Sequence, residues 1–117
     1  MRPVITNKET ISDGDQIGYI QFGGTTDGLA ASPVYDYNSS VIRAIAYGDW
    51  DTASADSGSS LQFLTTNDGS SLNGVRMVID GSGNVGINEE NPQTLLHITG
   101  DGSSAPIMVE SMIAVVS

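Results

Sequence analysis

The sequence contains no cysteine, which excludes disulfide bonds and thiolate-ligated metal sites. No stretch approaches the roughly 18 consecutive apolar residues of a membrane-spanning helix. The first ten residues also lack the apolar segment of a secretory signal peptide. We therefore expect no membrane insertion, and synthesis in the cytoplasm whatever the final destination.

Basic residues are scarce. The chain carries 4 Lys and Arg against 14 Asp and Glu, for a formal net charge of −10. Binding to phosphate backbones needs a basic surface, so the composition excludes nucleic acid as a partner. The same composition argues against binding to an anionic membrane surface.

Large apolar residues are few for a chain that must fold. Leu, Ile, Val and Phe supply 28 of the 117 residues, whereas Gly, Ser, Thr, Asn and Asp supply 55. Ordering each residue costs about 1–2 kcal/mol of conformational entropy, and apolar burial must offset most of it. A monomer of this composition would be marginal, so we expect an oligomer that buries apolar side chains between its subunits.

Helical periodicity is almost absent, and period-two alternation replaces it. Only residues 106–117 are compatible with either a helix or a strand. Elsewhere, short apolar pairs are separated by turn-forming clusters such as the Asp80–Asn84 segment. The alternation predicts an all-β meander of about six to eight short strands with less than about 10% helix. The apolar pairs are Ile20 and Phe22, Ile42 and Ala44, Leu61 and Phe63, Met77 and Ile79, Val85 and Ile87, and Leu96 and Ile98.

The segment from residue 76 to residue 98 has a specific pattern. It reads Arg-Met-x-Ile at 76–79, Gly-Asn-Val-Gly-Ile at 83–87, Pro92, and Leu-His-Ile at 96–98. This pattern resembles a module of bacteriophage tail fibres and related virion appendages, and the similarity extends, mainly in spacing, back to about residue 9. The Gly-Thr that usually follows Gly-Ile is replaced here by Asn-Glu-Glu at 88–90.

The resemblance implies an intertwined or β-prism-like homotrimeric fibre segment located in the virion. The twelve alternating apolar residues would then line the trimer interior. In longer relatives a C-terminal self-cleaving chaperone domain often follows, and nothing of that length follows Ile98. We expect either a small virion protein or a piece of a longer fibre. A tail fibre involved in host attachment is the leading interpretation, and a head fibre or capsid decoration protein is the alternative.

Three segments follow from this pattern. Residues 1–10 form an N-terminal arm that carries Arg2 and Lys8 and is a candidate anchor to other virion proteins. Residues 11–99 form the trimeric β-module. Residues 100–117 form a C-terminal segment, either a strand or a tail.

No catalytic or cofactor-binding constellation is recognisable, so we expect a protein that is not an enzyme. His97 is the only histidine, and strand alternation places it opposite the face of Leu96 and Ile98, in a structural or interface role. Asp49, Asp51 and Asp56 surround Trp50 and could suggest a glycosidase, but a narrow meander offers no deep cleft for two catalytic acids.

Sugar binding without chemistry is the alternative from another functional class. The candidate glycan contacts are Trp50, Tyr35, Tyr37 and Tyr47. Calcium binding by Asp80, Ser82 and Asn84 is disfavoured, because position 12 of the loop is Asn91 rather than the bidentate Glu of an EF-hand. We predict no metal and no cofactor.

Two arginines lie inside predicted strands of this acidic chain. We expect Arg43 and Arg76 each to pair with a carboxylate, Asp80 being the nearest in sequence to Arg76. The alternative is a ring of three arginines that holds an anion on the trimer axis.

Overall fold

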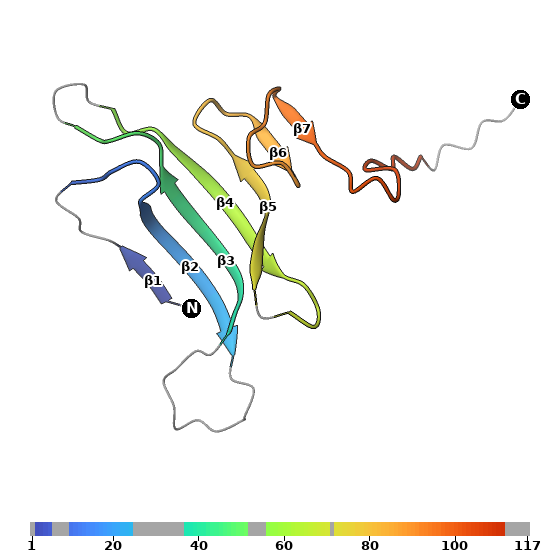
Figure 1. The fold of residues 1–117 in the computed structure, drawn as a ribbon, viewed down its shortest axis with the longest axis horizontal. Helices are drawn as coiled ribbons and strands as arrows, with labels where there is room; N and C mark the ends of the chain where they lie inside the picture. The colour runs from blue at the N-terminus through green and yellow to red at the C-terminus, as the bar shows by residue number, and fades with distance from the viewer. Residues whose placement is uncertain (1, 6–9, 25–36, 52–55, 71, 112–117) are drawn as a thin grey trace, which may run out of the picture.

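The computed structural model describes residues 2–5, 10–24, 37–51, 56–70 and 72–111, and in these ranges the protein is all-β with no helix. None of the described residues therefore belongs to a helix that is long and apolar enough to cross a membrane. Seven strands lie side by side in a single sheet in chain order (Figure 1). They are β1 (Arg2–Ile5), β2 (Gln16–Gly24), β3 (Tyr37–Ala46), β4 (Ser59–Thr66), β5 (Asn73–Ile79), β6 (Val85–Ile87) and β7 (Leu96–Ile98).

The predicted all-β meander is confirmed up to β6, and the last connection differs. Strands β1 to β6 are paired antiparallel, whereas β6 and β7 are parallel. Residues 88–95 return the chain to the start of β6. This loop begins at Asn88, whose φ of 53° reverses the chain direction, and it is fixed to β6 where Val85 N donates to Leu95 O at 2.9 Å.

Three strands are longer than the apolar pairs indicated. β2 has 9 residues, β3 has 10 and β4 has 8. Ser59, Ser60, Thr65 and Thr66 extend the backbone ladder of β4 at both ends of its apolar centre. Backbone hydrogen bonding does not depend on side-chain polarity, so these polar residues continue a strand that a hydrophobic pattern marks only in its middle.

Cross-strand register gathers the alternating apolar residues onto one face of the sheet. Two rows run across the strands, and each row joins residues that are direct partners in neighbouring strands. The first row is Ile20, Ile42, Phe63, Met77, Ile87 and Ile98, and the second is Ala44, Leu61, Ile79, Val85 and Leu96. Phe22 lies two residues beyond Ile20 on the same side of β2. We call these twelve residues the apolar face.

The few well-buried side chains lie mostly on the opposite face. Val41 and Leu64 are direct partners, exposed by 8% and 4%, and Val78 is fully buried beside Gln62. None of the twelve residues of the apolar face is fully buried in the single chain. Leu96 is 58% exposed. Each described strand contacts only its sheet neighbours, apart from weak contact between β3 and β5, so the sheet forms one layer.

The structure describes part of each end of the chain. Residues 2–5 of the predicted N-terminal arm form the edge strand β1, in which Ile5 pairs with Gly18. Residues 106–111 are neither helix nor strand, and the segment after β7 runs away from the sheet (Figure 1). Within it, Met108 and Val109 are 80% and 86% exposed.

The hairpin between β5 and β6 forms as predicted. Asp80 N donates to Asn84 O at 2.9 Å, and Gly83 N donates to Asp80 O at 3.0 Å. Gly83 has a φ of 85°, which glycine adopts without steric cost. Asp80 Oδ1 also accepts hydrogen bonds from Ser82 N and Asn84 N at 2.9 and 2.8 Å. The acid and amide residues of this segment therefore build the turn itself.

We predict that Gly86→Ala destabilises the protein by about 1–3 kcal/mol, the usual cost of overpacking. Gly86 is buried, and a methyl group on its Cα would collide with the backbone carbonyl oxygen of Glu89. Gly74→Ala is the matched control, because a methyl group there meets only the Arg76 guanidinium, at an ordinary 3.8 Å. Urea denaturation of both variants measures the difference. Equal stability of the two variants would contradict the close approach.

Candidate functional site

His97 lies where alternation predicted it, opposite the apolar face. It pairs with Gly86 in the β6–β7 ladder, its Nδ1 accepts a hydrogen bond from Gln93 N at 3.3 Å, and its Nε2 lies 3.9 Å from Glu89 Oε2. Glu89 Oε2 also accepts from Thr99 Oγ1 at 2.9 Å. These contacts connect the 88–95 loop to β7, which is a structural arrangement.

Of the four aromatic candidates for glycan contact, the structure describes the side chains of Trp50 and Tyr47, and both residues contact Gly58. Trp50 is half-buried, and its Nε1 donates to Gly58 O at 3.0 Å. The same carbonyl accepts from Tyr47 N at 2.9 Å. Trp50 therefore ties its loop to the start of β4. Tyr35 and the side chain of Tyr37 lie outside the described part of the chain.

Two of the acids near Trp50, Asp49 and Asp56, accept hydrogen bonds from backbone amides, as does Asp13. Asp49 Oδ1 accepts from Asp13 N at 3.0 Å, and Asp13 Oδ1 accepts from Gly48 N at 2.8 Å. Asp56 Oδ1 accepts from Gly58 N at 3.1 Å. Exposed carboxylates in such contacts stabilise loops. The contacts of Asp13 and Asp49 join the loop before β2 to the loop after β3.

The predicted pairing of Arg76 with Asp80 is wrong. Arg76 donates from Nε to Thr65 Oγ1 at 3.0 Å and from Nη2 to Thr65 O and Asn67 Oδ1. The register shift between Phe63 and Leu64 leaves Arg76 without a direct partner on β4. Its side chain turns toward the far end of the β4–β5 hairpin, away from Asp80, whose carboxylate accepts the turn amides.

Arg43 also binds an amide where a carboxylate was expected. Its Nε donates to Gln62 Oε1 at 2.9 Å, across the β3–β4 ladder. Among the described residues the structure shows no acceptor for its two terminal nitrogens. The one hydrogen bond orients the guanidinium plane and leaves the Nη1–Nη2 edge available.

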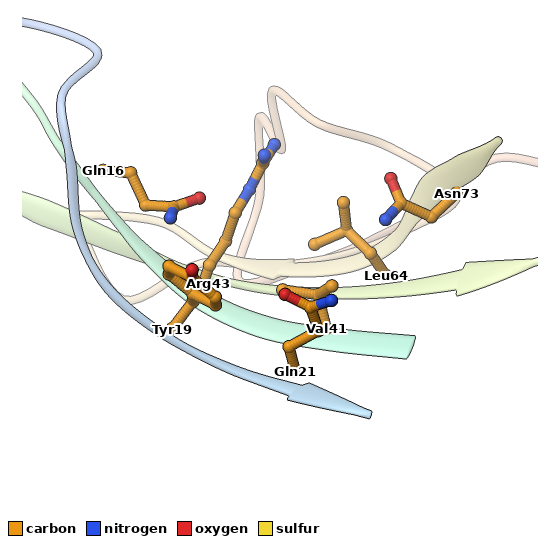
Figure 2. Close-up of a pocket in the computed structure, with 7 residues that line it drawn as sticks. All are labelled: Gln16, Tyr19, Gln21, Val41, Arg43, Leu64 and Asn73. Carbon is orange, nitrogen blue, oxygen red and sulfur yellow. The ribbon is translucent and has the colours of Figure 1, made fainter. Parts of the chain in front are cut away.

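A hollow of about 280 Å³ surrounds the Arg43 side chain on the face opposite to the apolar face (Figure 2). Four neighbouring strands supply its lining, which consists of Gln16, Tyr19, Gln21, Val41, Arg43, Leu64 and Asn73. Figure 2 shows Arg43 rising between Gln16 on one side and Leu64 and Asn73 on the other. The lining thus combines one cation, several neutral polar groups and an apolar floor formed by the buried Val41 and Leu64.

Sequence reasoning singled out Arg43 but missed this hollow. Strand alternation in β3 was the available signal. Val41 and Arg43 alternate with the apolar-face residues Ile42 and Ala44, so they lie together on the opposite face. Gln16 belongs to β2 and Asn73 to β5, and only the strand order brings them near Arg43. No protein-family model matches this chain, and no curated protein matches it in sequence.

We predict a pH-dependent contribution of Glu89 to stability. Hydrogen bonds from Asn91 N and from Thr99 lower the pKa of the Glu89 carboxyl, and His97 adds a smaller effect in the same direction. Because the pKa is lower in the folded chain than in the unfolded chain, the contribution is complete above the ordinary carboxyl pKa. The contribution of Glu89 to stability is lost as pH falls from the ordinary carboxyl pKa through the lowered pKa of the folded chain.

The urea midpoint of the wild type should therefore fall more on acidification than that of Glu89→Gln. Glu90→Gln is the control, since Glu90 is the exposed neighbouring acid. Parallel pH profiles for the wild type and Glu89→Gln would contradict this role of the carboxylate.

Proposed function

We propose that this chain is a bacteriophage virion structural protein, a homotrimeric fibre segment that packs its apolar face against two other copies of itself. The observation that carries the proposal is the two-row apolar face, which no described element of the chain covers. A sheet with one apolar face must bury it against another layer to be stable. A partner of the same chain provides that layer.

The charge distribution supports self-association of so acidic a chain. None of the twelve residues of the apolar face is charged. The acids that make described turn contacts, such as Asp13, Asp49 and Asp80, lie in loops at the ends of strands. Three copies can therefore bring their apolar faces together without placing carboxylates in the interface, where unpaired charges are costly.

The local structure gives the virion-appendage pattern a physical meaning. Gly83 supplies the left-handed turn conformation, Gly86 allows close passage of the Glu89 carbonyl, and Pro92 is buried in the returning loop. His97 then pairs beside Gly86 in β7. The residues that resemble the fibre module are those that build β5, the turn, β6 and the parallel β7, which supports the proposed class.

We predict that Phe63→Glu dissociates the trimer. Phe63 stands in the middle of the first apolar row, between Ile42 and Met77. Truncating a buried phenylalanine costs about 3–5 kcal/mol, and a glutamate adds an unpaired buried charge at each of three sites. Light scattering should give the wild type three times the 12.2 kDa chain mass and the variant a lower mass.

Leu72→Glu is the matched control for that experiment. Leu72 is 79% exposed, precedes β5 and lies outside the apolar face, so its substitution should leave the mass unchanged. A wild-type chain that is folded and monomeric at micromolar concentration would refute the trimer.

Within the structural class, a tail fibre is the leading assignment and a head fibre or capsid decoration protein is the second. Cryo-microscopy of particles that carry the chain distinguishes these positions directly. A carbohydrate-binding adhesin is the alternative function, and binding of the trimer to arrayed glycans tests it. A depolymerase assay on host polysaccharide tests for enzymatic activity.

We predict that deletion of residues 2–8 leaves the trimer assembled but prevents its incorporation into particles. β1 is an edge strand that pairs only with β2, so its removal leaves the ladder from β2 to β7 complete. The segment carries Arg2 and Lys8, half of the basic residues, which can steer it to an acidic platform that repels the rest of the chain. The amount of protein in purified particles measures incorporation.

Substitution of Arg2 and Lys8 by Gln is the companion variant, because it removes the charge and retains the strand. Normal incorporation of the deletion variant would exclude the N-terminal segment as the anchor. The apolar segment from Ile107 to Val116 would then be the better candidate.

A further inference from the structure

We infer that the hollow around Arg43 is a binding site for a small hydroxylated carboxylate, namely a single acidic sugar unit such as a hexuronic acid. The site lies within one chain and on the face opposite to the apolar face. The inference therefore does not depend on trimer formation. None of the seven lining residues is one of the aromatic residues that the sequence suggested for glycan contact.

The charge of the lining indicates an anion. Arg43 is the only charged residue among the seven that line the hollow, although the chain as a whole carries −10. An isolated cation in such a chain selects a compact ligand with one negative charge, since a long polyanion would be repelled by the acids in the surrounding loops.

The geometry of Arg43 favours a carboxylate. The hydrogen bond from Nε to Gln62 Oε1 holds the guanidinium in one orientation, so little side-chain freedom remains to be lost on binding. The Nη1–Nη2 edge then offers two parallel N–H donors, a spacing that matches the two oxygens of a carboxylate.

The rest of the lining suits a sugar ring. Gln16 and Asn73 flank the arginine (Figure 2), and each side-chain amide can both donate to and accept from a hydroxyl group. Val41 and Leu64 provide an apolar floor for the carbon-bound hydrogens of a ring. The volume of about 280 Å³ is at the lower end of ligand pockets, which suits one ring rather than a longer chain.

The test is a titration of the isotope-labelled protein with glucuronic acid, followed by NMR of the residues lining the hollow. Glucose is the matched neutral ligand, and inorganic phosphate is the matched anion without a ring. We expect glucuronic acid to shift the resonances of the hollow and to bind at least about tenfold more tightly than glucose or phosphate. Added salt should weaken it.

Three variants assign the effect to residues. Arg43→Gln should reduce affinity at least about tenfold, and Arg43→Lys several-fold because the charge is kept but the planar fork is lost. Asn73→Ala, at the half-buried first residue of β5, should reduce affinity several-fold. Arg76→Gln is the control and should bind as the wild type does. Oligomeric mass and unfolding curves of the same samples separate loss of binding from loss of the fold or of the assembly.

Several outcomes would overturn the inference. They are the absence of shifts at millimolar glucuronic acid, equal binding of glucose, binding of phosphate as tight as that of glucuronic acid, and unchanged affinity in folded Arg43→Gln and Asn73→Ala. Binding is then measured with oligosaccharides that contain the acidic unit at an end or in the interior. This comparison shows whether the site takes a free sugar or a unit within a polysaccharide. Binding of only the internal form would also contradict a site of one ring.

Discussion

Cross-strand register is the constraint on which the properties of this sheet depend. Ile42 stands between Ile20 and Phe63, and the row continues through Met77 to Ile87 and Ile98. Side chains alternate between faces, so a slip of one residue in any pair would move the apolar side chains of the shifted strand to the other face. The register shift between Phe63 and Leu64 shows how the chain tolerates an irregularity: Arg76 is left unpaired in the ladder, and alternation resumes on both sides of it. The apolar face exists because every pair keeps this register.

The acids of the chain stabilise the connections that maintain that register. Asp80 accepts two backbone amides within the β5–β6 turn, and Asp13 and Asp49 exchange hydrogen bonds with backbone groups of each other's loops. After β7, Asp101 Oδ1 accepts hydrogen bonds from the Ser103 hydroxyl at 2.6 Å and from Ser103 N at 2.8 Å. Both contacts lower the pKa of the Asp101 carboxyl, the hydroxyl contact more than the amide contact. Carboxylates used in this way remain at the ends of the sheet. Because these acids lie in the connections, the chain can carry a net charge of −10 while the two faces of the sheet carry few charges.

The two faces differ in chemistry, and we assign them different partners. The apolar face is suited to copies of the same chain, because it is uncharged and extends across six strands. The opposite face buries Val41, Leu64 and Val78 and presents Arg43, oriented by Gln62, in a hollow. In the trimer that we propose, the second face would lie at the outer surface. Self-association and recognition of a ligand would then be performed by residues that alternate along the same strands.

The sequence by itself determined the all-β class, the turn at Asp80–Asn84 and the membership of the apolar face, because each rests on local chemistry: turn residues, period two and backbone conformation. It did not determine strand length, since polar residues such as Ser59 and Thr66 continue a ladder through backbone hydrogen bonds. It misplaced the partners of Arg43 and Arg76, because pairing depends on register and on a bulge. The parallel β7, the edge strand β1 and the hollow formed by residues of four strands were decided only by the tertiary structure, which brings together residues that no local pattern connects.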